Sequence, residues 1–164
     1  MSFLPTVNLI RQSAIALVVF VSACSSVTEP GSGPSDFSSG NFRLNVVASD
    51  ACTTLAAAGH DRSWNMGLVK SGSVVSVSMQ GWDATTTVVA QTDFAGTANG
   101  SSLTLTGGVF DTIYGCATTL CYRADGAITA TQSGNVLTGT LSGAVTYEFA
   151  TCTATDHKVT LTRR

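Results

Sequence analysis

Two histidines beside aspartates are the residues with the clearest chemical potential in this sequence. His60-Asp61 follows Cys52 and Asp156-His157 follows Cys152. Imidazole, carboxylate and thiolate groups are common ligands of zinc and other transition metals, so His60 and His157 could hold a metal if they met in space. No compact ligand motif surrounds either histidine. We therefore favour two histidines at the rim of the fold that are hydrogen-bonded to neighbouring aspartates or to strand ends, with no metal and no other cofactor.

Enzymatic motifs are absent from the sequence. It contains no Gly-x-Ser-x-Gly elbow, phosphate-binding loop, His-Glu-x-x-His helix or dinucleotide fingerprint. Glu29 and Glu148 are the only glutamates, so a carboxylate pair for glycoside hydrolysis would have to use aspartates. Nothing singles out a pair among Asp83, Asp93, Asp111 and Asp125. We expect no catalytic residues.

The first two dozen residues have the pattern of a secretory signal. Positive charge at the amino terminus and Arg11 precedes an apolar core at residues 14–21, which is shorter than the about 20 residues of a spanning helix. Val21-Ser22-Ala23-Cys24 resembles the lipobox of bacterial lipoproteins, an aliphatic residue and two small ones before a cysteine. The resemblance implies cleavage before Cys24 and lipidation of that cysteine by acyl chains such as palmitate. An ordinary signal peptide cut nearby is the alternative.

This resemblance predicts three segments: a lipoprotein signal peptide at 1–23, a lipidated cysteine and flexible tether at 24–40, and a folded domain at 41–164. Ser, Gly and Pro dominate the tether, which has too little apolar surface to order itself. Phe37 is its one large apolar residue and marks where we expect packing to begin. The implied location is the bacterial cell envelope, with the membrane as partner through Cys24. Ser25 after the anchor resembles lipoproteins of the outer membrane or cell surface.

Four further cysteines predict disulfides, because an even number in an exported domain is typical of a crosslinked fold. The four allow three pairings. We favour Cys116–Cys121, which closes a local loop, together with Cys52–Cys152, which joins the two ends of the domain.

Charge is sparse in the mature chain. Without Arg11, seven Lys and Arg stand against ten Asp and Glu, and no basic cluster is present. Nucleic-acid binding needs grouped Lys and Arg, so nucleic acid is not an expected partner. Thr, Ser and Gly dominate the polar positions, which is typical of exported β proteins.

Alternating apolar residues predict strands throughout residues 41–164, beginning with Phe42, Leu44 and Val46 on one face. Three dipeptides predict two-residue hairpin turns: Ser71-Gly72, Asn99-Gly100 and Ser133-Gly134. These turns would place Trp64 opposite Met79, Phe94 opposite Leu105 and Ile128 opposite Gly139. Cross-strand partners then have matching faces in every hairpin.

Three segments need a separate interpretation. A tight turn at Ser142-Gly143 would put apolar residues on the wrong face, so we expect a longer loop or a bulge there, with Tyr147 and Phe149 inward. Asp50 could cap one or two helical turns that end at Gly59. Residues 109–114 are predicted as a strand, because an even number of strand passes is needed to bring Cys52 and Cys152 to the same end of the barrel. The clear strands between these cysteines number seven, and residues 109–114 supply the eighth.

One apolar face per hairpin and short connections predict an all-β fold, a single antiparallel up-and-down barrel of about 8 to 10 strands with one short helix. This layout resembles lipocalin-like and fatty-acid-binding-like barrels, in architecture alone. Gly40-Asn41-Phe42 is only a partial echo of the lipocalin Gly-x-Trp pattern. A β-sandwich is the alternative.

The predicted interior carries the candidate ligand-binding residues, with Gly96 and Gly139 leaving space opposite large side chains. Plain core packing is the alternative, and we favour it because small barrels are usually filled. We expect a non-catalytic binding module for a small apolar ligand or envelope component. A structural or inhibitory module that binds another exported protein through its loops is the second possibility. The ligand-binding candidates are Trp64, Met66, Leu68, Met79, Phe94, Leu103 and Leu105.

Overall fold

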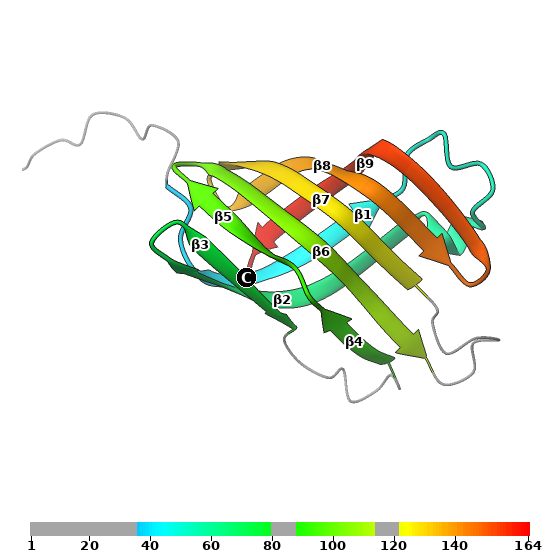
Figure 1. Ribbon diagram of the computed structural model, residues 1–164, viewed down its shortest axis with the longest axis horizontal. Helices are drawn as coiled ribbons and strands as arrows, with labels where there is room; N and C mark the ends of the chain where they lie inside the picture. Colours follow the sequence, from blue (N-terminus) through cyan, green and yellow to red (C-terminus); the bar gives the residue numbers. More distant parts are fainter. Residues whose placement is uncertain (1–35, 80–87, 114–121) are drawn as a thin grey trace, which may run out of the picture. The chain divides into compact units, whose positions relative to one another are not determined.

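The computed structural model describes residues 36–79, 88–113 and 122–164. Cys24, the predicted signal peptide and the Cys116–Cys121 pair lie outside these residues. Among the described residues, no helix is long and apolar enough to cross a membrane. The elements are nine strands and one short 3-10 helix (Figure 1): β1 Gly40–Val47, η1 Ala57–Gly59, β2 Asp61–Ser71, β3 Val74–Met79, β4 Val88–Thr92, β5 Ala95–Asn99, β6 Ser102–Ile113, β7 Tyr122–Ser133, β8 Val136–Tyr147 and β9 Ala150–Arg163.

Eight of these strands form a closed antiparallel barrel, as predicted. Each pairs with its neighbour along the chain, and β9 returns to pair with β1. A closed sheet leaves one face inside and one outside, which explains why buried and exposed residues alternate along β1 and β9. The result is the all-β up-and-down barrel of the sequence prediction rather than the two packed sheets of a sandwich.

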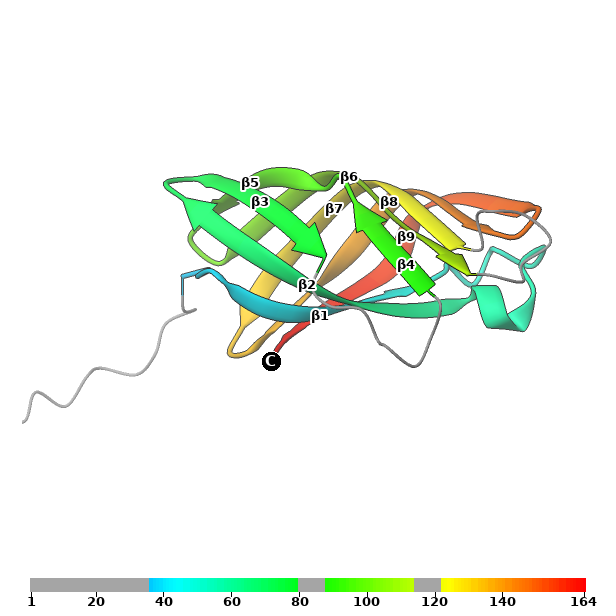
Figure 2. The same ribbon diagram turned by 90° about the horizontal axis from the view of Figure 1, so that it is seen from below.

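The remaining strand, β4, lies outside the ring of eight and extends the line of β5 along β6 (Figures 1 and 2). The first half of the long strand β6 pairs with β5 and the second half, from Val109 to Ile113, pairs with β4. Residues 109–113 are therefore strand, as predicted, but they continue β6 instead of making a separate pass. Six passes separate Cys52 from Cys152, not eight, and the number remains even.

All three predicted hairpin turns occur one residue later than expected. The last paired residues are Ser71 with Val74, Asn99 with Ser102, and Ser133 with Val136. Met79 therefore pairs with Met66 rather than Trp64, and Ile128 pairs with Leu141 rather than Gly139. Each register moves by two residues. Because side chains alternate with period two, the inward faces were correct although the partners were wrong.

The position of glycine explains the shift. Gly72, Gly100 and Gly134 have φ of 61°, 55° and 59°, whereas the residue after each has no positive φ. This is the pattern of a type II′ turn, which takes glycine at the first central position. The prediction had placed glycine second, as in a type I′ turn.

The predicted irregularity at Ser142-Gly143 is a register shift in the β8–β9 pairing and not a connection between strands, since β8 continues unbroken from Val136 to Tyr147. Leu141 pairs with His157 but Gly143 pairs with Ala154, so the register changes between them. The chain turns only at Glu148, which has φ of 52°. The inward placement of Phe149 was wrong, because this residue lies in the turn and is 76% exposed.

The predicted helix over residues 50–59 is wrong in extent. Only Ala57–Gly59 is helical, and the position before it, Ala56, makes no side-chain capping bond. The segment from Ala48 to His60 is instead a compact loop closed by backbone hydrogen bonds, including Ala48 N–H to His60 O at 2.8 Å. Gly59 ends the short helix, as expected.

A single hydrophobic cluster occupies the barrel interior, with side chains from β1, β2, β6, β7, β8 and β9. The glycines in the strands do not leave the expected space. A Cβ on Gly139 would lie 1.9 Å from Thr129 O and 2.6 Å from Ala130 Cα. These glycines allow neighbouring backbones to approach closely, as interior strand glycines commonly do.

One end of the barrel carries the three type II′ turns and is here called the hairpin end. The chain enters the barrel at this end, at Phe37. This residue is buried, its ring lies 5.9 Å from that of Phe42, and its N–H donates to Gly100 O at 2.9 Å. Arg163 covers Phe42 and donates to the Ser38 carbonyl at 2.8 Å. Packing thus begins at Phe37, as predicted.

We expect Gly139→Ala to destabilise the barrel by about 1 to 3 kcal/mol, because the added methyl group meets the backbone of β7. The measurement is urea unfolding followed by far-UV circular dichroism. Gly134→Asn is the control: its φ of 59° suits asparagine and no atom lies within 4 Å of a Cβ there. Equal losses in the two variants would contradict the close approach at Gly139.

Candidate ligand site at the disulfide end

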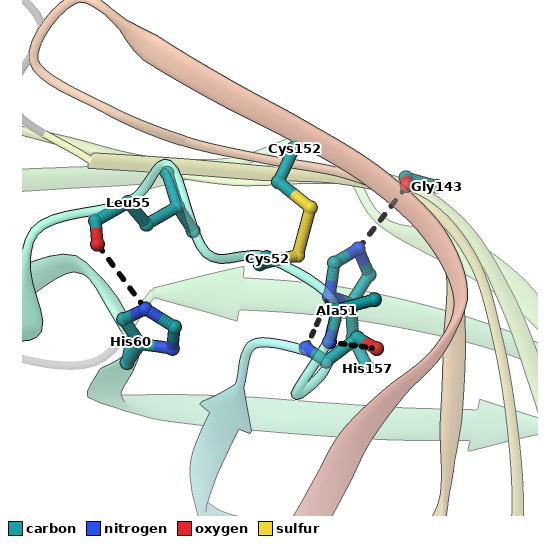
Figure 3. The surroundings of a disulfide bond; sticks show 8 residues. Ala51, Cys52, Leu55, His60, Gly143, Cys152 and His157 are labelled. Atoms are coloured by element: carbon teal, nitrogen blue, oxygen red, sulfur yellow. Dashed lines mark hydrogen bonds between the residues drawn. A yellow bond between two sulfur atoms is a disulfide. The ribbon is translucent and has the colours of Figure 1, made fainter.

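The end of the barrel opposite the hairpin end is crosslinked. Cys52, in the loop after β1, forms a disulfide with Cys152 of β9, with 5.5 Å between their Cα atoms (Figure 3). The predicted Cys52–Cys152 pairing is therefore present. We call this end, which also carries the β8–β9 turn, the disulfide end.

The loop of residues 48–60 packs against the disulfide end. Cys52 and Leu55 are buried, and both belong to the hydrophobic cluster of the interior. Gly59 lies so close to β8 that a Cβ there would be 2.5 Å from the Tyr147 Cβ. The loop thus covers the β8–β9 side of this end.

Both histidines bind backbone groups beside the disulfide (Figure 3). His157 is fully buried; its Nδ1 accepts the Ser49 N–H at 3.0 Å and its Nε2 lies 3.2 Å from Gly143 O. This arrangement assigns the Nε2–H tautomer. His60 Nε2 lies 3.2 Å from Leu55 O. The hydrogen-bond partners are backbone atoms rather than the neighbouring aspartates.

The structure does not bring His60 and His157 together as ligands of one ion. Over residues 36–79, 88–113 and 122–164, no group of three or more His, Cys, Asp and Glu side chains is placed to hold a metal. Both cysteines of this end are in the disulfide, so neither can supply a thiolate.

A cluster of four side chains from three strands lies at the disulfide end. It is here called the polar cluster: Arg62 and Trp64 of β2, Asp111 of β6 and Tyr122 of β7. Arg62 and Trp64 share a face of β2 because they are two residues apart. Asp111 and Tyr122 are direct partners in the β6–β7 register. Strands distant in sequence therefore place two charged and two aromatic side chains at one end of the barrel.

An ion pair forms the centre of the polar cluster. Arg62 Nε donates to Asp111 Oδ2 at 2.7 Å, and Nη2 lies 2.5 Å from the same oxygen. The Asp111 side chain is 1% exposed and that of Arg62 is 34% exposed. Burial raises the pKa of Asp111, and the neighbouring guanidinium only partly offsets this effect.

Three buried polar atoms of the cluster lack a hydrogen bond of ordinary geometry within the described part of the chain: Trp64 Nε1, Asp111 Oδ1 and Tyr122 Oη. The Trp64 side chain nevertheless acts on the Asp111 carboxyl and lowers its pKa, against the larger effect of burial. Burial, and next the charge of Asp111, raise the pKa of Tyr122, so this residue keeps its hydroxyl proton. The Trp64 and Tyr122 rings meet edge to face at 5.2 Å. Native proteins satisfy the great majority of buried polar atoms, so three such atoms on neighbouring side chains indicate a group that the described residues do not supply.

The predicted ligand-lining residues are mostly buried, and only Trp64 belongs to the polar cluster. Met79 is half-buried, and the other candidates pack within the hydrophobic cluster: Met66, Leu68, Phe94, Leu103 and Leu105.

Sequence reasoning missed Arg62, Asp111 and Tyr122. The alternation of side chains along a strand could have found two of them. Arg62 is two residues from the inward Trp64, and Asp111 is six residues from the inward Leu105, so both charged residues are expected to face inward. A charged residue at an inward strand position is unusual enough to mark a site.

Comparison with known proteins gives no relative: no family model, curated protein or solved structure matches the chain.

We expect the stability advantage of the wild type over Asp111→Asn to shrink as pH rises. A folded-state pKa above the ordinary 3.8 means that the folded protein binds the Asp111 proton more strongly than the unfolded chain does. The stability that this proton contributes is fully present below pH 3.8 and is lost as the pH rises through the raised folded-state pKa. The Asn variant has no such proton. Urea unfolding of both proteins across this range measures the difference, at most about 1.4 kcal/mol per pH unit. A difference that grows with pH would show that Arg62 outweighs burial.

Proposed function

We propose that this protein is an exported, lipid-anchored β-barrel that binds a small, largely apolar ligand at its disulfide end without catalysing a reaction. The observation that carries the proposal is the polar cluster, with three buried atoms that lack partners among the described residues. Specific ligand sites combine apolar walls with a few well-placed polar groups, and this end of the barrel has that composition.

The middle of the barrel is a less suitable place for a ligand. Residues such as Leu44, Leu105 and Leu141 are fully buried against one another in the hydrophobic cluster. Arg62, in contrast, is part-exposed and leads from the surface to the buried Asp111. This gradient supports binding at the disulfide end.

The anchor part of the proposal depends on the lipobox-like residues 21–24. The described chain enters the barrel at the hairpin end, at Phe37. A tether from Cys24 would therefore join the barrel at the hairpin end.

The binding part is tested by native and denaturing mass spectrometry of the exported mature protein, purified without detergent. We expect a discrete adduct in the native spectrum that disappears on denaturation, because the buried polar atoms need a partner. Tyr122→Phe should lower adduct occupancy. Tyr147→Phe should not, because the half-buried Tyr147 pairs with Tyr122 in the β7–β8 register but its hydroxyl is not one of the buried atoms without a partner among the described residues. A native mass equal to the chain mass would contradict a carried ligand.

The anchor part is tested separately with Cys24→Ala. The wild type should fractionate with membranes and carry the mass of acyl chains on Cys24, because several chains are needed for stable anchoring. The variant should lose both properties. An unacylated wild type that begins at another residue would overturn the anchor and leave the binding proposal standing.

A second function, binding of another exported protein through loops, is favoured by one observation. Phe149 is 76% exposed at the tip of the β8–β9 turn, beside the disulfide. Phe149→Ser separates the two functions when chemical crosslinking to exported proteins and the native mass are both measured. If the variant no longer crosslinks to a partner but keeps its native adduct, partner binding belongs to the turn.

A further inference from the structure

The unpartnered atoms of the polar cluster form a defined set of hydrogen-bonding groups. The Trp64 indole N–H can only donate, the second oxygen of an ionised Asp111 can only accept, and the Tyr122 hydroxyl can do both. The indole N–H is near enough to Asp111 to favour its ionised form, but neither atom has a hydrogen bond of ordinary geometry. A group that satisfies this set must itself offer a donor and an acceptor. A hydroxyl or an amide meets this requirement, whereas a ketone or an ester, which only accepts, would leave Asp111 Oδ1 without a donor.

The charge balance of the cluster excludes a charged head group. Arg62 directs two nitrogen atoms to Asp111 Oδ2, so the ion pair is complete without a ligand. A carboxylate would face the free oxygen of Asp111, and an ammonium would face the guanidinium of Arg62. A net charge brought into this buried place would add to two charges that already neutralise each other, and burying such an additional charge costs several kcal/mol.

The surroundings favour an apolar remainder of the ligand. The edge-to-face pair of Trp64 and Tyr122 supplies aromatic surface beside the polar atoms, and both rings are at least 95% buried. Met66 lies two residues further along the same face of β2 and is also buried.

We propose that the polar cluster binds an uncharged hydroxyl- or amide-bearing amphiphile. Its polar group donates to Asp111 Oδ1 and accepts from Trp64 Nε1, with Tyr122 Oη completing the network. Arg62 pairs with Asp111 and holds its carboxyl group in place. The inference rests on the proposed function and narrows its ligand from an apolar molecule to one with an uncharged donor and acceptor.

The test is a titration of the exported mature protein followed through the indole N–H signal of Trp64 in a ¹H–¹⁵N NMR spectrum. Trp64 and Trp82 are the two tryptophans, so Trp82→Phe leaves a single indole signal. The probes share a six-carbon chain: hexan-1-ol, hexanamide, hexan-2-one and hexanoate. We expect saturable shifts with hexan-1-ol and hexanamide. Hexan-2-one and hexanoate should bind with affinities at least about tenfold weaker.

Matched tyrosine variants locate the binding. Tyr122→Phe should weaken hexan-1-ol binding by about tenfold because it removes one hydrogen-bonding group. Tyr147→Phe removes the hydroxyl of the residue that pairs with Tyr122 in the β7–β8 register. This hydroxyl is not one of the buried atoms without a partner among the described residues, so the affinity should stay unchanged. Equal effects of both variants would overturn the assignment of the site.

Two further results would overturn the inference without deciding the proposed function. Tightest binding by hexanoate would contradict an uncharged ligand while supporting a binding module. No saturable shift with any probe would mean that the polar cluster holds ordered water only. In that case a native adduct, measured separately, would still support a ligand elsewhere in the barrel.

Discussion

Closure of β9 on β1 is the constraint on which the rest of the structure depends. Leu44 pairs with Leu161 and Val46 with Val159, and all four side chains are buried. Without this pairing the sheet would have two exposed edges, which are prone to association, and no separate inside. Closure also brings Cys152 beside the loop that follows β1, so the disulfide can form between residues 100 apart in sequence.

The two ends of the barrel have different physical roles. The hairpin end is tied by tight turns and by Arg163, whereas the disulfide end holds the buried ion pair. In the chain-entropy model a crosslink across about 100 residues contributes roughly 4.7 kcal/mol, which can offset the burial of charge. A buried ion pair often contributes little to stability, or even less than apolar residues of similar volume. The position of Arg62 and Asp111 is therefore compatible with the proposed ligand site.

Much of the fold could be predicted because strand alternation is local. The inward residues Phe42, Leu44 and Val46 follow from period two alone. The pairing partners were harder to predict. The glycine of a two-residue hairpin turn can occupy either central position, and the choice shifts the register by two residues. The helix near Asp50 failed for another reason: the disulfide and the His157–Ser49 hydrogen bond hold that segment as a loop. Tertiary contacts there override a weak local preference.

The sequence by itself determined which side chains face inward, the choice of cysteines that could tie the domain's ends, and a lipobox-like start. Each depends on residue type and short spacing. Only the tertiary structure decided that Arg62 and Trp64 meet Asp111 and Tyr122, because these residues belong to strands that approach one another across the lumen when the barrel closes. Inward parity is set by neighbouring residues, but contact across a barrel depends on strand number and stagger, which are properties of the whole sheet.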